Sequence, residues 1–344
     1  MMPLVSGSSK HEVVMEILPG VHQIAIDYKG RPLNLYLLRF GEESLLMDTG
    51  DADSPEKWIL PYFKKIGFDA GKLTYIFLTH PDVDHVAGIY GMKAVAPQAK
   101  FLCGTLDREQ IETPEGLGRI RARAYYYWHG MGPDDAALEK FIEHVGGHGK
   151  TTPMWRTFDG GESLMLGGKE LKVLHLPGHS MGHLGIHVPW EGAAIIGDAV
   201  HHTANRFLDG RAAFAVTYMY IDAYLGTIAQ LRAMGLKKLF SCHWPDCKDE
   251  GMVGRFLDES REYALKAEGV LLETVKAAGA GGITLKEACA KAKPGLGDWP
   301  ADKDGYAAGM CCGHLQRLAS LGYVRMSGDR PVRYTYEEMW LGLR

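Results

Sequence analysis

The sequence has little of several features that assign a chain to a specialised class of protein. Its 344 residues include only six cysteines, at positions 103, 242, 247, 289, 311 and 312. Their spacing forms no disulfide framework, so we expect reduced thiols rather than a disulfide-stapled scaffold. The formal net charge is -4, which excludes a basic field over the whole surface that would attract nucleic acid or anionic membranes.

Long apolar runs and targeting signals are also absent from the sequence. No uncharged apolar stretch reaches the roughly 18 residues that a membrane span needs, so we expect no membrane association. The first ten residues contain no apolar core of the signal-peptide type, and we therefore expect a cytoplasmic protein. Residues 149–151 read Gly-Lys-Thr, but His144 stands where a phosphate-binding loop requires glycine, so we reject that loop.

The composition is that of an ordinary globular protein, and the length suffices for two domains. Hydrophobic residues make up 46% of the chain and charged residues 23%, which excludes a disordered or fibrous chain. Alternating and apolar runs predict strands over residues 18–50, 73–78 and 162–198. We expect a catalytic region at 1–250 with a helical insertion at 104–150, a linking helix at 251–281, and a small unit at 282–344.

The unit at 282–344 has the pattern of a winged-helix-like domain. Thr284 and Glu287 form a capped helix start, a second helix is expected at 309–321, and a hairpin follows. A DNA-binding regulator would use this second helix, with nearby arginines on the phosphates. Since that helix has few side chains suited to reading bases, we do not expect nucleic acid as a partner. We favour an appendage that packs near an active site or at a homodimer interface.

The densest chemical signal is the stretch Thr79–His85, which reads Thr-His-Pro-Asp-Val-Asp-His directly after the apolar run at 73–78. His80, Asp82, Asp84 and His85 are four candidate ligands within six residues. Imidazole and carboxylate groups packed so closely need partners when they are buried, and a metal ion is the usual one. The stretch therefore predicts metal binding.

Three further candidate ligands occur downstream, each where an apolar run ends. His179 follows the run at 171–176, Asp198 follows 193–196, and His243 follows 238–240. Loops at strand ends are where functional side chains gather in layered α/β folds. The recurrence of the same arrangement predicts that these residues join the Thr79–His85 stretch in one site.

Taken in order, these motifs resemble those of the metallo-β-lactamase superfamily. The resemblance covers residues 18 to 245 and includes Asp48-Thr49-Gly50, the His-x-x-x-Asp-His core, Pro177-Gly178-His179 and Gly197-Asp198. It implies an α/β fold, a four-layer αβ/βα sandwich, with a dinuclear metal site between two sheets and a small-molecule substrate.

The resemblance also implies a role for each candidate ligand by its position in the family pattern. His80, Asp82 and His179 would hold one ion, Asp84, His85 and His243 the other, and Asp198 would bridge both. Asp48 would brace the loop without binding metal. A hydroxide bridging the two ions would attack an ester, thioester, lactone or phosphoester, and Asp84 would orient it as the catalytic residue.

Asp82 departs from the common His-x-His-x-Asp-His pattern, because it stands at the second histidine. The exchange makes the ligand set more anionic and harder, which favours iron or manganese over zinc. A carboxylate at this position resembles flavodiiron proteins, so a diiron oxidoreductase acting on O2, NO or peroxide with a separate electron donor is the alternative. We expect two divalent ions, zinc or iron, with manganese also open.

Several other side chains are candidates for the site, each with a structural alternative. His201 or His202 could contact substrate or donate a proton, or the pair could lie behind the site or at the surface. His183 is expected behind the ligands. The aromatic cluster at 125–128 could line a substrate pocket or fill the core of the insertion. Tyrosines 218, 220 and 224 could place a phenol near an oxyanion or pack against a helix.

Overall fold

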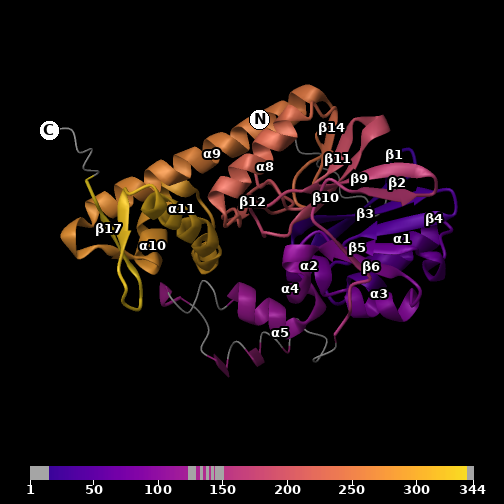
Figure 1. Cartoon of the computed structure of the whole chain (residues 1–344), viewed down its shortest axis with the longest axis horizontal. Coiled ribbons are helices and arrows are strands. Elements are labelled where there is room, and N and C mark those ends of the chain that lie inside the picture. The colour runs from indigo at the N-terminus through magenta and orange to yellow at the C-terminus, as the bar shows by residue number, and fades with distance from the viewer. Residues whose placement is uncertain are drawn as a thin grey trace.

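The chain folds around two stacked β-sheets, as the computed structural model shows for residues 15–122, 129–131, 135–136, 139–140, 143 and 151–338 (Figure 1). Within these residues the first sheet has seven strands in chain order: β1 (Met15–Leu18), β2 (Val21–Tyr28), β3 (Arg31–Phe40), β4 (Glu43–Met47), β5 (Tyr75–Phe77), β6 (Lys100–Gly104) and β7 (Arg156–Phe158). Strands β1 to β4 pair antiparallel, whereas β4 to β7 pair parallel.

The second sheet has a different strand order, which brings distant parts of the chain together. It runs β14 (Lys238–Phe240), β11 (Ala193–Ile195), β10 (Leu184–Val188), β9 (Lys169–His175) and β8 (Ser163–Leu166). β11 pairs parallel with β14, and the other neighbours pair antiparallel. It follows that β9, β11 and β14 all point the same way, so their carboxyl ends lie at one edge.

Alternation along the strands explains how the second sheet is packed on both faces. Val173 belongs to a buried cluster with Leu37 of the first sheet, whereas the next residue, Leu174, belongs to a cluster with Ile228. Successive side chains of a strand point to opposite faces, so one face meets the first sheet and the other meets helices. The clusters extend through both interfaces of the sandwich.

Helices cover the outer faces and complete four layers (Figure 1). The first sheet packs against a helical turn at Pro55–Ile59, α1 (Leu60–Lys65) and α3 (Ile89–Val95), and the second against α8 (Ile221–Ala233) and α9 (Glu250–Ala277). The predicted αβ/βα sandwich is confirmed. None of the described helices is both long enough and apolar enough to cross a membrane.

The expected insertion begins with short helices along one edge of the sandwich (Figure 1). These are α4 (Arg108–Glu112), α5 (Pro114–Gly116) and a helical turn at Leu117–Ala122. The aromatic cluster at 125–128 lies outside the described residues, so its two alternatives both stand.

The C-terminal elements follow α9 and share its hydrophobic core. They are β15 (Ile283–Thr284), α10 (Leu285–Leu296), a helical turn at Ala301–Ala307, α11 (Ala308–Ser320), β16 (Val324–Met326) and β17 (Arg333–Tyr336). The capping box of Thr284 and Glu287 is confirmed. Leu271 of α9 and Leu315 of α11 lie in the same buried cluster as Ile228 of α8, so the C-terminal elements pack directly onto the helical layer of the sandwich.

Candidate metal centre

The predicted site residues meet at one edge of the sandwich because several parallel strands end there. In the first sheet, β4 is followed by Asp48 and β5 by His80. In the second sheet, β9, β11 and β14 are followed by His179, Asp198 and His243. The carboxyl ends of parallel strands share an edge, and the two sheets bring their edges together.

The first group of candidate ligands consists of His80, Asp82 and His179. Asp82 Oδ2 lies 3.0 Å from His179 Nε2 and 3.7 Å from His80 Nε2. One ligand atom from each residue lies within 4.8 Å of the other two, which is the spacing expected around a single ion. Asp82 reaches this position as the residue that precedes the short helix α2 (Val83–Val86).

The second group consists of Asp84 and His85, both on α2, together with His243. His243 Nε2 lies 3.6 Å from Asp84 Oδ2, and His85 Nε2 lies 4.0 Å from Asp84 Oδ1. Asp198 Oδ2 lies 3.2 Å from His243 Nε2 and 3.7 Å from His85 Nε2. Asp198 also groups with His80, so it stands between the two groups.

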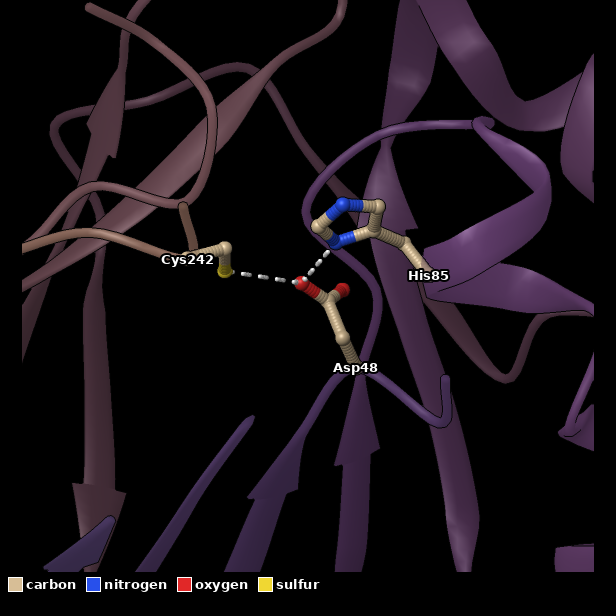
Figure 2. A group of neighbouring side chains, drawn as sticks. All are labelled: Asp48, His85 and Cys242. Atoms are coloured by element: carbon tan, nitrogen blue, oxygen red, sulfur yellow. Dashed lines mark hydrogen bonds and ion pairs between the residues drawn. The ribbon is translucent and has the colours of Figure 1, made fainter. Parts of the chain in front are cut away.

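Asp48 orients His85 from behind (Figure 2). Its Oδ2 accepts a hydrogen bond of 2.8 Å from His85 Nδ1, and its carboxylate also accepts from the backbone N–H and hydroxyl of Thr79. The Thr79 hydroxyl therefore has its lone pairs free to accept from His80 Nδ1, at 2.9 Å. Both histidines are held as Nδ1–H donors, which turns Nε2 toward the candidate ligands.

Backbone carbonyls hold the other two histidines in the same way. His179 Nδ1 donates to the carbonyl of Thr217 at 3.1 Å, and His243 Nδ1 donates to the carbonyl of Pro32 at 2.7 Å. Metal-binding histidines usually donate their second nitrogen to such a partner. All four histidines of the cluster thus present Nε2 to the candidate ion positions.

Asp48, His85 and Cys242 also lie close enough together to suggest a metal group (Figure 2). Cys242 Sγ is 3.9 Å from Asp48 Oδ2, and burial raises the pKa of the thiol to about 12. The thiol is therefore protonated and donates to Asp48, while His85 Nδ1 is already engaged there. We interpret this trio as support for His85 and not as an ion site.

Three atoms of the cluster are buried and have no hydrogen-bond partner among the described residues: Nε2 of His80, Nε2 of His85 and Oδ1 of Asp198. Burial lowers the pKa of His80 well below its usual value. Burial opposes charge on His85 too, but the carboxylates of Asp198 and Asp48 outweigh it and raise the pKa of His85. Unpartnered lone pairs beside buried carboxylates call for a cation, and divalent metal ions fit this donor set.

Comparison with known proteins is consistent with this geometry. The family model described as the metallo-beta-lactamase superfamily matches residues 28–243, which is more than half of the chain. The chain belongs to the metallo-β-lactamase superfamily.

Solved structures share the metallo-β-lactamase fold over nearly the whole chain. A metallo-beta-lactamase family protein from Thermus thermophilus has a TM-score of 0.71 and 22% identity, covering 93% of this chain and 100% of that one. A beta-lactamase domain protein from Burkholderia ambifaria has a TM-score of 0.69 and 16% identity, covering 97% and 96%. The likeness shows the fold and extends into the helices after residue 250.

Curated relatives match shorter stretches. A probable metallo-hydrolase of Mycobacterium bovis is 29% identical over 151 residues, 43% of this chain and 43% of that protein. A hydroxyacylglutathione hydrolase of Hyphomonas neptunium is 39% identical over 61 residues, 18% of this chain and 24% of that protein. The chain therefore aligns with less than half the length of these relatives.

The structure separates the two histidines that the sequence left undecided. His201 is buried against the metallo-β-lactamase site, with its ring centroid 4.7 Å from that of His179 and its Nε2 without a hydrogen-bond partner among the described residues. His202 pairs with Glu259 at 2.6 Å and stacks on Phe256. His202 has a positive φ of 41°, and the two rings point in different directions.

Other candidates take supporting positions. His183 accepts a hydrogen bond from the Asp198 backbone N–H at 3.1 Å and stacks on His80, as expected for a residue behind the ligands. Tyr218 stacks on Tyr224, whose hydroxyl accepts from the backbone N–H of His201. Tyr218 and Tyr224 therefore pack behind the His201 segment, which is the structural alternative, whereas Tyr220 is 42% exposed at the start of α8.

Residues 178–182 also fit the Gly-x-Ser-x-Gly pattern of serine hydrolases, a match that sequence inspection overlooked. The Ser180 hydroxyl donates to the carboxylate of Asp107, and both side chains are buried. No described histidine forms a hydrogen bond with this hydroxyl, and a nucleophilic serine needs such a base. In this chain the serine and its hydrogen bond stabilise the loop that carries His179.

One side chain at the site was missed from the sequence. Arg31, the first residue of β3, places Nη2 3.9 Å from Asp84 Oδ2. It follows a Gly-containing turn between two strands, where an exposed arginine is ordinary, and no local motif marks it. Its position depends on strand pairing in the first sheet, because β3 runs antiparallel to β4 and β4 parallel to β5, so β3 begins at the edge where the chain leaves β5.

Proposed function

We propose that this chain is a dinuclear metal-dependent hydrolase. The observation that carries the proposal is the set of buried, unpartnered atoms of His80, His85 and Asp198, which lie between two groups of candidate ligands. His80, Asp82 and His179 would hold one ion, Asp84, His85 and His243 the other, and Asp198 would bridge them. Two ions satisfy these atoms, whereas one ion would leave a group without a cation.

The chemistry proposed for the site is attack by water on an ester, thioester, lactone or phosphoester. Bound divalent ions supply a low pKa for water and polarisation of the bond to be cleaved. Asp84 is the side chain that would orient the attacking water, because its carboxylate lies at the edge of the cluster and is 17% exposed. Asp48 and Thr79 keep His80 and His85 fixed so that they need not reorganise during the reaction.

The charge of the ligand set affects which metal ions the site prefers. Asp82 adds a third carboxylate to those of Asp84 and Asp198, and its Oδ2 lies 3.0 Å from His179 Nε2. A harder, more anionic ligand set favours iron or manganese relative to zinc. We therefore propose a site that accepts zinc or iron, with manganese as a third candidate.

Elemental analysis of protein purified without added metal tests the proposal directly. About two ions per chain, together with hydrolysis that a chelator abolishes and metal restores, is the expected result. The substrate panel contains carboxylic esters, thioesters, lactones and phosphodiesters. Thioesters come first because one relative is named a hydroxyacylglutathione hydrolase.

Two outcomes would overturn the proposal. Two irons with visible absorption that responds to reduction or O2, without hydrolysis of any substrate, would establish the diiron oxidoreductase alternative. Folded protein that binds no metal from solution would remove both alternatives.

For the C-terminal elements we propose a winged-helix-like appendage at 282–344 and not a DNA reader. Arg317 is engaged by Asp222 and Glu268, and Arg333 donates to the carbonyls of Gly281 and Gly282. Arginines that already pair with groups of the same chain are less available for phosphates. A duplex-binding assay at two salt concentrations tests this: salt-dependent binding would contradict it.

A further inference from the structure

Arg31 occupies a built position beside the candidate metal centre. Its guanidinium contacts two aromatic rings, with Cζ 4.9 Å from the ring centroid of Tyr28 and 4.7 Å from that of Phe214. The side chain is only 15% exposed. Contact with two rings restricts the guanidinium and leaves its N–H groups able to donate to an acceptor.

The hydrogen-bonding capacity of this guanidinium is unused within the described part of the chain. Its contact with Asp84 is 3.9 Å long, beyond hydrogen-bond distance. No described group accepts a hydrogen bond from its five N–H donors. A guanidinium without acceptors beside the candidate metal centre can donate hydrogen bonds to a ligand's oxygens.

Other parts of the chain hold Phe214 and the turn before Arg31 in place. Phe214 stacks on Tyr306 of the C-terminal part, with ring centroids 4.3 Å apart. The turn before Arg31 is tied to the neighbouring hairpin by a 2.8 Å hydrogen bond from the Leu208 N–H to the Gly30 carbonyl. The guanidinium is therefore preorganised, so little side-chain entropy is lost when it binds an anion.

We propose that Arg31 determines substrate specificity by binding a carboxylate or phosphate group on the substrate, next to the bond that is cleaved. This inference rests on the proposed hydrolase function and narrows its substrate class to anionic esters or thioesters. A planar guanidinium binds either oxyanion with two parallel hydrogen bonds.

A pair of matched esters tests the proposal. 4-Nitrophenyl hydrogen glutarate and 4-nitrophenyl valerate differ in a terminal carboxylate against a methyl group. For the metal-loaded protein we expect kcat/KM to favour the glutarate ester, and Arg31→Met to reduce that preference by about 10- to 100-fold. Using the ratio of the two esters removes any general loss of activity. Arg31→Lys should recover only part of the preference, because lysine lacks the two-pronged geometry.

Arg39→Met is the matched control variant. Arg39 lies at the other end of the same strand β3 and also stacks on an aromatic ring, that of Phe68, at 4.9 Å. Its loss should leave the ester ratio unchanged. A change in Arg39→Met as large as that in Arg31→Met would overturn the proposal, since the effect would then come from the strand and not from the site.

A second role for Arg31, holding Asp84 in place, predicts different results. In that case Arg31→Met would lower the rates with both esters equally and reduce the metal content per chain. Either an unchanged ester ratio or a parallel loss of metal and both activities would overturn the specificity proposal.

Binding of the product acids separates failure of this inference from failure of the hydrolase. Calorimetry on the metal-loaded protein should give tighter binding of glutarate than of valerate, and Arg31→Met should abolish the difference. That result would support the Arg31 site even if neither ester were hydrolysed, in which case only the proposed reaction would fail. Equal affinities in the unchanged protein would overturn the inference.

Discussion

The buried histidines His80 and His85 of the candidate metal centre and His129 beside α11 are held in opposite ways. At the strand ends, His80 and His85 have one nitrogen fixed by Thr79 or Asp48, and their second nitrogen is buried without a hydrogen-bond partner among the described residues. An unsatisfied buried imidazole nitrogen is costly unless a ligand completes it. This end of the molecule is arranged for something that the chain itself does not supply.

Beside α11, the chain supplies a hydrogen-bond partner to both nitrogens of His129. Tyr334 Oη lies 3.1 Å from its Nδ1 and Cys312 Sγ lies 3.2 Å from its Nε2. His314 is intermediate, because its Nε2 lies 3.2 Å from the Tyr218 hydroxyl, whereas its buried Nδ1 lies 3.6 Å from a carboxylate of α9 and has no hydrogen-bond partner among the described residues. Burial lowers the pKa of both histidines, so both are neutral structural groups.

This difference indicates which buried histidines are candidates for binding a ligand. The histidines of both regions are buried, but both nitrogens of His129 are engaged by protein, whereas Nε2 of His80 and of His85 has no hydrogen-bond partner among the described residues. Substitutions at the strand ends should therefore change metal content and activity, whereas those beside α11 should change stability.

Asp198→Asn should have the largest effect. The change removes the charge from the residue between the two candidate ligand groups, so metal content should fall from about two ions to one or none. Hydrolysis should fall by more than about 100-fold, beyond the range typical of residues that only support ligands. Elemental analysis and rate measurement check this, with circular dichroism as the test of folding. Retention of two ions and full rate would remove Asp198 from the proposed bridging position.

Asp48→Asn should have the next largest effect, because it weakens the carboxylate that orients His85 and Thr79. Metal affinity or rate should fall by about 10- to 100-fold, measured by titration of the chelated protein with metal. Asp53→Asn is the matched control, since Asp53 lies in the next loop and pairs with Lys57 at the surface. Equal behaviour of the two variants would show that Asp48 has no orienting role.

Glu268→Gln should sharpen the contrast by affecting stability alone. The neighbouring imidazole of His314 and hydrogen bonds from Arg317, against the opposing effect of burial, lower the pKa of Glu268 below its ordinary value of 4.5. The stabilisation is therefore present above that value and lost as the pH falls through the lowered pKa. At neutral pH the variant should lose about 1–2 kcal/mol in a denaturant titration, and the difference should shrink in acid. Loss of metal in this variant would break the comparison.

Asp82→His should have the smallest effect on hydrolysis, because it restores the common ligand pattern of the superfamily. The site becomes less anionic and softer, so the ratio of zinc to iron bound should rise. Hydrolysis with zinc should be kept or raised, by up to about tenfold. Competitive loading with equal zinc and iron, followed by elemental analysis, measures the ratio. A variant that binds neither metal would contradict the hydrolase proposal.

The fold could be predicted well from the sequence because its signals are local. The apolar runs that became β5, β9, β11 and β14 are visible as such, and so is the capping box of Thr284 and Glu287. The candidate ligands of the stretch Thr79–His85 lie within six residues of one another. Their proximity could therefore be predicted from the sequence.

The rest of the site could not be predicted from neighbours in the chain. His201 and His202 have the same local surroundings, yet a backbone φ of 41° at His202 directs one ring to the site and the other to Glu259. Arg31 carries no motif, and only the pairing of β3, β4 and β5 in the first sheet brings the start of β3 to Asp84.

The sequence by itself determined the chemical types of the donors, their order, and their place at the ends of strands. Only the tertiary structure places Asp198 3.2 Å from His243 and brings Arg31 into contact with the rings of Tyr28 and Phe214. The physical reason is that strand order in the second sheet, and the packing of the two sheets, depend on apolar contacts between residues far apart in the chain. Those contacts set which strand ends meet, and no single segment encodes them.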